Sequence, residues 1–445
     1  MTRLPDHVVG DARASTFAWD RLERLVDIEN RMAGHEGEMR GAEVVRSAFE
    51  EVGLADVAVD EFELPGWWRG SSAIAIPDRG RRYEADHEVI ALPGTPPGEV
   101  TGEVVDVGYG LPADFAAADV DGQIAMVRSD SPADADHWHH RMEKYASALE
   151  AGADALVFRN HIDGCLPPTG EVGYGNRPAP IPAVGVSAEL GSRLARYAAD
   201  GATARAAVDC ETGPATAPNI EGSLGPDTDE AVVVTAHVDA HDVAEGAVDN
   251  GVGTVLVCEV ARLLSQVTAD LDTRVRFVVV GAEEVGLYGS THLAATTDRD
   301  RVKCVMNIDG SGKSRTPKVR RTNTFESLAE PFETVGADLD IEFPVEDDIS
   351  PHGDCWPWTE RGIPAATVGS TSPDDGRGWG HTQADTLDKL DVRDLRDLAI
   401  AYASAVLELA DESRSFPEKE PAEIRDALHD GYVRELKAAG RWRFD

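Results

Sequence analysis

One repeated pattern constrains the fold of this chain more than any other: a short apolar run, then acidic residues or histidine, then a segment with helical periodicity. The apolar runs are AVVVTAH (231–237), RVRFVVVG (274–281), KCVMNI (303–308) and AATVGS (365–370). Amphipathic helical segments, 251–267 and 395–410, accompany these runs. Continuous apolar strands that alternate with helices are typical of a parallel sheet covered on both faces. We therefore expect an α/β fold with a mostly parallel or mixed central sheet flanked by helices.

Ionisable side chains gather where these apolar runs end or where a loop precedes a helix. They are His237, Asp239, Asp249, Glu283, Glu284, Asp309 and His381. The carboxyl ends of parallel strands meet at one edge of a sheet, and ligands bind in the crevice there. Because like charges repel at close range, carboxylates that converge in such a crevice need a neutralising partner. Water, an arginine or a bound cation are the alternatives.

The mixture of imidazole and carboxylate in this set favours the cation. These groups suit Zn²⁺ and, less exclusively, Co²⁺ or Mn²⁺. One zinc ion takes three or four protein ligands, so a larger set fits two ions that share a bridging carboxylate. Two such ions about 3.5–4 Å apart, as in aminopeptidases, can activate water and polarise a carbonyl group.

Five motifs in a fixed order resemble the M28 family of zinc metallopeptidases. They are HVDA, GAVDNGVG, GAEEVGLYGS, NIDG and GHTQADT, and the N-terminal NRMAGHEG resembles the opening segment of that family. The resemblance spans residues 20–412. It implies that His237 and Asp309 bind one metal ion, that Glu284 and His381 bind a second, and that Asp249 bridges both. Two Zn²⁺ ions are the cofactors expected, with Co²⁺ or Mn²⁺ as substitutes.

The same resemblance assigns roles to three further carboxylates. Glu283 would be the general base, which takes a proton from the attacking water and passes it to the leaving amine. Asp239 would hold the second ring nitrogen of His237, and Asp385 would do the same for His381. The fold implied is that of the zinc exopeptidases, a phosphorylase/hydrolase-like α/β fold.

A second strand–helix pattern, shorter and more compact, fills residues 93–215. Its stretches DGQIAMVRS and KYASALEAGADALVF are similar to a protease-associated (PA) domain, which several M28 members carry at this place. We expect a catalytic domain split into 1–92 and 216–412, a smaller α/β PA insertion at 93–215, and a charged helical tail at 413–445. Loop-like composition at 92–100 and 211–222 places the boundaries.

The function expected is that of a metal-dependent exopeptidase, an aminopeptidase acting on short peptides. Alternatives stay open from sequence: a carboxypeptidase on the same scaffold, an M20-type amidohydrolase, or a one-zinc glutaminyl cyclase. M20-type enzymes place the bridging aspartate much farther from H-x-D than the ten positions between Asp239 and Asp249. A peptide-binding protein without catalysis is the alternative outside enzymology.

Charge and hydropathy restrict partners and location. The formal net charge is −39, from 42 basic and 81 acidic residues, which excludes nucleic acid as a partner. No run approaches the ~20 apolar residues of a membrane span, and the N-terminus lacks an apolar leader, so a cytoplasmic protein is expected. The acidic excess suits concentrated salt and predicts a halophilic archaeal source. Five cysteines without a CxxC pair predict reduced thiols, and a homo-oligomer is left open.

Some ionisable residues fall outside this scheme. His241 and Asp242 are expected to be solvated loop residues, and the histidines of DHWHHRMEK (136–144) to form a surface patch beside a helix of the PA domain. In GDCWPW (353–358), Gly353-Asp354-Cys355 stands where relatives often have Ser-Asp-His. Trp356 and Trp358 are expected to pack in the interior.

Overall fold

A single sheet runs through both halves of the molecule in the computed structural model, which describes residues 3–135, 137–173, 179–372 and 378–444. Within these residues it has 13 strands, and the order of its main path is β12-β13-β11-β9-β10-β8-β4-β5-β6-β7-β3. The strands are β1 (Ala55–Ile76), β2 (Arg81–Tyr83), β3 (Val89–Ala91), β4 (Gly98–Asp106), β5 (Ile124–Arg128), β6 (Ala155–Arg159), β7 (Ala183–Val186), β8 (Thr203–Leu224), β9 (Ala231–His237), β10 (Arg274–Val280), β11 (Val302–Ile308), β12 (Pro317–Arg321) and β13 (Ala365–Ser370).

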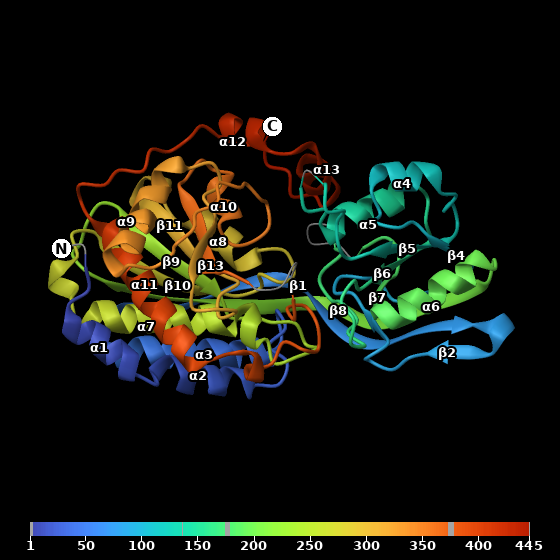
Figure 1. Ribbon diagram of the computed structural model, residues 1–445, viewed down its shortest axis with the longest axis horizontal. Helices are drawn as coiled ribbons and strands as arrows, with labels where there is room; N and C mark the ends of the chain where they lie inside the picture. The colour runs from blue at the N-terminus through green and yellow to red at the C-terminus, as the bar shows by residue number, and fades with distance from the viewer. Residues whose placement is uncertain (1–2, 136, 174–178, 373–377, 445) are drawn as a thin grey trace.

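In the larger lobe, helices cover both faces of the sheet, as expected for an α/β fold (Figure 1). Here β9, β10, β11 and β13 are parallel, and β12 and β8 are antiparallel at the two sides. The helices of this lobe are α1 (Asp6–Ala14), α2 (Phe17–Val26), α3 (Glu36–Val52), α7 (Val252–Ser265), α8 (Tyr288–Thr296), α9 (Ala329–Leu339), α10 (Trp356–Thr359) and α11 (Val392–Ala410).

Alternate residues of β9 show how the two faces are filled. Val232 and Val234 join the large core that contains α2, α3, α7 and α11, whereas Val233 joins a smaller core with Trp358 of α10. All of these side chains are buried. A strand that buries both of its faces must be apolar throughout, which accounts for the unbroken run AVVVTA.

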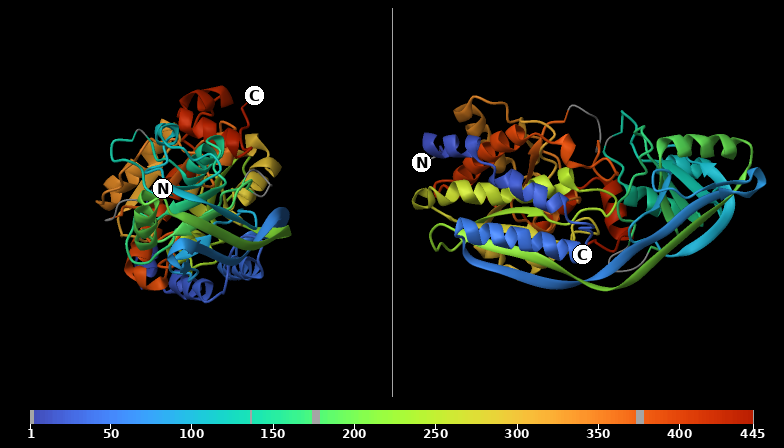
Figure 2. Two further views of the ribbon diagram at one scale, coloured as in Figure 1. Left: turned by 90° about the vertical axis from the view of Figure 1, so that its right-hand side faces the viewer. Right: turned by 90° about the horizontal axis from the view of Figure 1, so that it is seen from below.

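The smaller lobe has its own parallel strands, β4 to β7, with β3 antiparallel at the edge. Its helices are α4 (Pro112–Ala117), α5 (Arg141–Glu150) and α6 (Ala188–Ala199). A glycine turn, Gly152 at φ +82°, separates α5 from β6, as the sequence predicted. The lobe lies beside the carboxyl ends of the strands of the larger lobe (Figures 1 and 2).

The connection between the lobes differs from the expectation. Residues 211–222 were predicted as a loop, but they belong to β8, which pairs antiparallel with β1 along nearly all of its length. Each strand has 22 residues, and together they extend from one lobe to the other (Figure 2). Pro214 lies opposite Pro65 in this ribbon. The Gly- and Pro-rich composition therefore marks a stretch of β8 with fewer backbone hydrogen-bond donors, and not the end of the strand.

The C-terminal tail contacts both lobes. It forms two short helices, α12 (Pro421–Ala427) and α13 (Asp430–Ala438), in place of the one surface helix that its charge pattern suggested. Leu436 packs into the large core, and Ala439 packs into the core of the smaller lobe. Figure 1 shows the tail crossing over the larger lobe, with α13 beside α5. Among the described residues, no helix combines the length and apolarity that crossing a bilayer requires.

Candidate functional site

The candidate site lies where adjacent strands of the larger lobe end. His237 is the last residue of β9, Glu283 and Glu284 follow β10, and Asp309 follows β11. The parallel register places Val280 of β10 beside His237, and β11 borders β9 on its other side. Residues about 45 and 70 positions apart in sequence are therefore neighbours at one edge of the sheet, as is usual for ligand sites in open α/β sheets.

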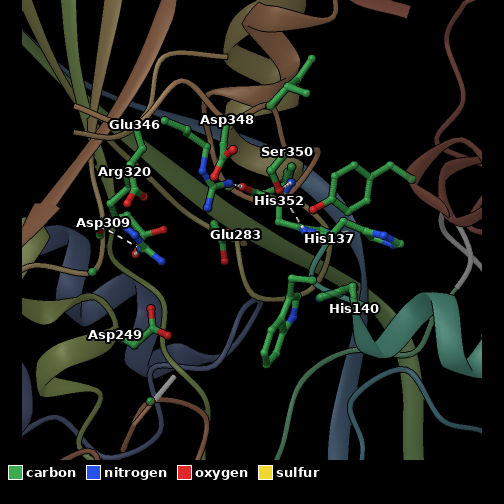
Figure 3. Close-up of a pocket in the computed structure, with 18 of the residues that line it drawn as sticks. His137, His140, Asp249, Glu283, Asp309, Arg320, Glu346, Asp348, Ser350 and His352 are labelled. Carbon is green, nitrogen blue, oxygen red and sulfur yellow. Dashed lines mark hydrogen bonds and ion pairs between the residues drawn. The ribbon is translucent and has the colours of Figure 1, made fainter. Parts of the chain in front are cut away.

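Asp249 lies at the centre of the cluster. Its Oδ1 is 3.6 Å from His237 Nε2, and its Oδ2 is 3.3 Å from His381 Nε2. His381 Nε2 is also 3.1 Å from Glu284 Oε2. On the other side, ligand atoms of His237, Asp249 and Asp309 all lie within 4.8 Å of one another. Figure 3 shows Asp249, Asp309 and Glu283 facing the same cleft.

Both histidines present the same ring nitrogen to this centre. His237 Nδ1 lies 3.1 Å from the backbone oxygen of Asp239, and His381 Nδ1 lies 3.2 Å from the backbone oxygen of Thr169. A carbonyl oxygen only accepts hydrogen bonds, so in each ring Nδ1 carries the proton and donates it. The lone pair is then on Nε2, directed at Asp249, which is the arrangement of a metal-ligating histidine.

Asp239 organises the two glutamates as well as His237. Its Oδ1 lies 3.4 Å from His237 Nδ1 and accepts from the Glu283 N–H at 3.1 Å, while its Oδ2 accepts from the Glu284 N–H at 3.0 Å. The preceding residue, Ala282, has φ +53°, and this turn brings both glutamates to the cleft side of the strand end. The predicted partner of His237 is therefore also the anchor of the GAEE turn.

Asp385 takes a different position from the predicted one behind His381. It accepts from the backbone N–H groups of Val248, at 2.6 Å, and Asp249, at 3.0 Å, so it fixes the loop that carries the central carboxylate. The contact to His381 Nδ1 comes instead from Thr169 in the smaller lobe, whose N–H also donates to the His381 carbonyl at 2.9 Å. The inserted domain thus helps to position a side chain of the centre.

The loop after His237 is buried, contrary to the expectation of solvated residues. His241 is 5% exposed, with Nε2 at 2.9 Å from Glu284 Oε2 and its ring against His381. Asp242 forms a two-point ion pair with Arg69 of β1, at 2.6 and 2.8 Å. The prediction for His241 and Asp242 was wrong because the polar side chains of this loop face the site and the β1–β8 ribbon instead of solvent.

The buried charges of the centre are unbalanced. The centre holds the carboxylates of Asp239, Asp249, Glu283, Glu284, Asp309 and Asp354 together with the imidazoles of His237, His241 and His381. Burial raises the pKa of Asp354 to about 7, and the Asp239 and Asp309 carboxylates contribute to this rise. Among the described residues, no donor reaches the buried Glu284 Oε1. A bound cation would offset this excess of buried carboxylates, and these donors fit zinc.

Glu283 differs from its neighbour in exposure and contacts. Its side chain keeps 15% exposure to the cleft, and its Oε2 lies 4.0 Å from His237 Nε2. Burial raises the pKa of Glu283 well above its usual value, and the carboxylates of Glu284 and Asp354 add to the rise, against the effect of His237. In Glu284, the imidazoles of His241 and His381 outweigh burial and lower the pKa. One glutamate is held within the cluster, and the other faces the space where a substrate would lie.

Two supporting residues were not predicted from the sequence because the site loops that they hold lie more than 200 positions away along the chain. Glu38 of α3 is fully buried and accepts from the N–H groups of Gly34, at 2.7 Å, and Ala282, at 2.8 Å. Arg31 donates to the carbonyls of Val238, Glu245 and Gly246 and so supports the loop before Asp249. The one sequence feature that pointed to this region was the stretch NRMAGHEG, which contains Arg31 and resembles the opening segment of family M28. Trp356 and Trp358 are 2% and 0% exposed and pack as expected.

The fold and the donor set define a class: metal-dependent hydrolases with an α/β exopeptidase fold. Residues 219–406 match peptidase family M28, and residues 100–194 match the PA domain. The catalytic part of the chain therefore matches peptidase family M28, with a PA domain inserted in it. This placement agrees with the resemblance seen in the sequence.

Individual proteins are similar over nearly the whole chain. Aminopeptidase YwaD of Bacillus subtilis is 28% identical over 433 residues, which cover 92% of this chain and 87% of that protein. Carboxypeptidase Q of Mus musculus is 23% identical over 431 residues, which cover 90% and 87%. The crystal structure of BSAP, a zinc aminopeptidase from Bacillus subtilis, superposes with a TM-score of 0.70 at 26% identity and covers 91% of this chain and 98% of that one.

Proposed function

We propose that this protein is an aminopeptidase that removes N-terminal residues from short peptides at a centre of two zinc ions. One observation carries the proposal: four side chains, from three strand ends and one loop, converge around Asp249, and Glu283 lies beside them facing the cleft. Similarity to YwaD and BSAP, both named aminopeptidases, supports the choice of reaction.

The donors divide into two groups around Asp249, which is why we propose two ions. His237 and Asp309 would hold one ion, Glu284 and His381 would hold the other, and Asp249 would offer one oxygen to each. Zinc in such a site supplies Lewis acidity, which polarises a peptide carbonyl and lowers the pKa of water to about 7. Co²⁺ and Mn²⁺ accept the same donors.

Glu283 would move the proton of the reaction. Hydrolysis requires a base that accepts a proton from water and an acid that returns it to the amine leaving group. The carboxylate of Glu283 faces the cleft, and its backbone N–H is held by Asp239. Such a positioned carboxylate typically contributes about 10²–10⁴-fold to the rate.

The dimensions of the cleft favour short substrates. It encloses about 750 Å³, and its lining comes from all parts of the chain: Glu283 and Asp309 of the larger lobe, Arg141 and Glu171 of the smaller lobe, and Tyr432 of the tail. A space of this size matches a ligand of a few residues. Because both lobes and the tail border it, a folded protein could not bring an internal peptide bond to Glu283.

A carboxypeptidase is the second candidate, and one observation favours it. The guanidinium of Arg320 on β12 lies 4.0 Å from Asp309 Oδ1, and its Nη1 donates to the Asp309 carbonyl at 3.2 Å. Lys313 and Lys318 line the same cleft. A basic group at this distance from the centre suits the C-terminal carboxylate of a substrate, and carboxypeptidase Q is similar over 90% of this chain.

Blocked peptides separate the two candidates. A tetrapeptide panel with the N-terminus free or acetylated, and the C-terminus free or amidated, is incubated with the metal-loaded protein. An aminopeptidase cleaves every member with a free N-terminus and none that is acetylated. A carboxypeptidase cleaves every member with a free C-terminus and none that is amidated. Chelation should abolish cleavage, and added Zn²⁺, Co²⁺ or Mn²⁺ should restore it.

Glu283→Gln tests the catalytic part of the proposal. We expect a loss of about 10²–10⁴-fold in kcat with the metal content of the wild type. Glu346→Gln is the matched control, since that carboxylate lies in the same cleft but pairs with Lys318 at 2.7 Å. It should lose far less activity than Glu283→Gln. A metal-loaded wild type that binds peptides without cleaving any would instead identify a peptide-binding protein.

The expectations about environment and assembly extend this proposal. A net charge of −39 in a chain that folds into two packed lobes supports a protein adapted to concentrated salt. We also propose a cytoplasmic location, which fractionation of the source cells tests. Light scattering coupled to gel filtration tests whether copies of the chain associate.

A further inference from the structure

A second group of histidines and glutamates lies across the cleft from the centre described above and shares no residue with it. The histidines of residues 136–144 were expected to form a surface patch. The structure buries His139 and His140, at 9% and 6% exposure, where the smaller lobe meets the tail. Figure 3 shows His140 and His352 facing the cleft, away from Asp249 and Asp309.

His140, His352 and Glu435 form the tightest part of this group. His140 Nδ1 lies 3.0 Å from Glu435 Oε1, and His352 Nε2 lies 2.9 Å from the same oxygen. The two imidazole rings are 3.9 Å apart at their centroids and tilt by 29°. Ligands of a tetrahedral zinc ion, at roughly 2.0–2.2 Å from the metal, lie roughly 3.3 Å from one another. A shift of a few tenths of an ångström would thus open the group into a metal site.

The surroundings of the three side chains favour a cation between them. Glu435 is 2% exposed, and among the described residues no donor reaches its second oxygen, Oε2. His140 Nδ1 faces a donor and an acceptor at once, the Met142 N–H at 3.3 Å and Glu435 Oε1 at 3.0 Å. One ring nitrogen carries either a proton or a lone pair and cannot serve both partners, whereas a cation between the ring and the carboxylate removes the conflict with Glu435. Ser350 Oγ, 3.1 Å from His352 Nδ1, holds that ring with Nε2 towards Glu435.

In a neighbouring cluster, the negative charge of a similar carboxylate is neutralised by an arginine. Glu143 is approached by His137 Nε2 at 2.9 Å and by His139 Nδ1 at 3.3 Å, so its donor set is similar. There, however, the guanidinium of Arg434 also binds the Glu143 carboxylate and supplies the positive charge. The group around Glu435 has no such arginine among its hydrogen-bond partners in the described parts of the chain. The two clusters therefore provide a matched comparison.

We propose that His140, His352 and Glu435 bind a divalent transition-metal ion, with Zn²⁺ preferred, at a site separate from the catalytic centre. The donor set of two imidazoles and one carboxylate suits zinc and leaves a fourth position open towards the cleft. The three ligands come from the N-cap of α5 in the smaller lobe, the loop before α10 in the larger lobe, and α13 of the tail. An ion here joins all three parts of the chain at the cleft wall.

Metal counting on the full, tag-free chain tests this site. The wild type and the variants His352→Gln and Glu435→Gln are loaded with Zn²⁺, freed of excess by gel filtration, and analysed by mass spectrometry for zinc per chain. We expect each variant to hold one ion fewer than the wild type. This difference does not depend on how many ions the catalytic centre holds, so it stays informative even if the proposed function fails.

His139→Gln is the control, because Arg434 already neutralises Glu143, and it should keep the wild-type count. Equal zinc content in the wild type, His352→Gln and Glu435→Gln would overturn the proposal and leave a hydrogen-bonded contact between the lobes and the tail. Loss of an ion in His139→Gln alone would also overturn it. If the variants do not fold, anomalous zinc density between the three side chains in wild-type crystals decides, and its absence refutes the site.

Discussion

Asp239→Asn is the substitution whose consequences the structure defines most fully. The carboxylate is completely buried, and its two oxygens serve three groups: the His237 imidazole and the backbone N–H groups of Glu283 and Glu284. Asparagine keeps the shape but offers one acceptor oxygen and an NH₂ group. One backbone N–H of the GAEE turn must then face another donor, which costs about 1–3 kcal/mol in a buried site.

The loss of charge behind His237 should weaken metal binding as well. A carboxylate that supports a ligating histidine is typically worth about 10–100-fold in metal affinity, or roughly 1.4–2.7 kcal/mol. We expect a chelator-competition titration of zinc to show this loss for the more weakly bound ion. Because the same turn carries Glu283, kcat should stay below that of the wild type even at saturating zinc.

Asp242→Asn is the matched control, three residues further along the same buried loop. Its carboxylate pairs with Arg69, and that pairing lowers the pKa of Asp242 despite burial. The control should lower the free energy of unfolding but leave zinc affinity close to that of the wild type. An Asp239→Asn protein that binds zinc as tightly as the wild type and regains full turnover would refute the role given to Asp239.

Three further perturbations have defined outcomes. Burial raises the pKa of Glu360 from 4.5 to about 7, so its contribution to stability is complete below about pH 4.5 and is lost as the pH rises towards 7. Glu360→Gln should thus stabilise the protein at pH 8, by at most about 3 kcal/mol, and leave it unchanged at pH 4; urea unfolding that shows equal gains at both pH values would contradict this. Asp385→Asn should weaken zinc binding by about 10–100-fold, since its carboxylate fixes the Val248 and Asp249 amides, and an unchanged dissociation constant would argue against it. Raising KCl from about 0.1 M to about 3 M should increase the melting temperature by screening the net charge of −39, whereas a melting temperature that is constant or falls would show that repulsion does not limit stability.

The convergence of the site residues was predictable because it follows from the sheet. Apolar runs that are buried on both faces identify parallel strands, and parallel strands bring their carboxyl ends together, so His237, Glu284 and Asp309 had to be neighbours. The local order of charges also carried information, since Asp239 follows His237 by two positions and reaches its ring.

Contacts between segments far apart in sequence were not predictable from local patterns. Asp385 has a backbone partner 137 positions away, and His381 is held by Thr169, 212 positions away in the inserted domain. The 211–222 stretch resembled a loop because glycine and proline weaken strand propensity, yet β1 supplies a partner for it along the ribbon. His140 and His241 were predicted to be surface residues because most polar side chains are exposed. The sequence does not reveal whether water or another protein group is the hydrogen-bond partner of such a side chain.

An anomalous difference map recorded at the zinc absorption edge tests the shared metal centre most directly. At the centre around Asp249, crystals of the zinc-loaded protein should give two peaks about 3.5–4 Å apart, one beside His237 and Asp309 and one beside Glu284 and His381. A single peak at this centre, or density that leaves Asp249 without a metal contact, would contradict the proposed two-ion centre.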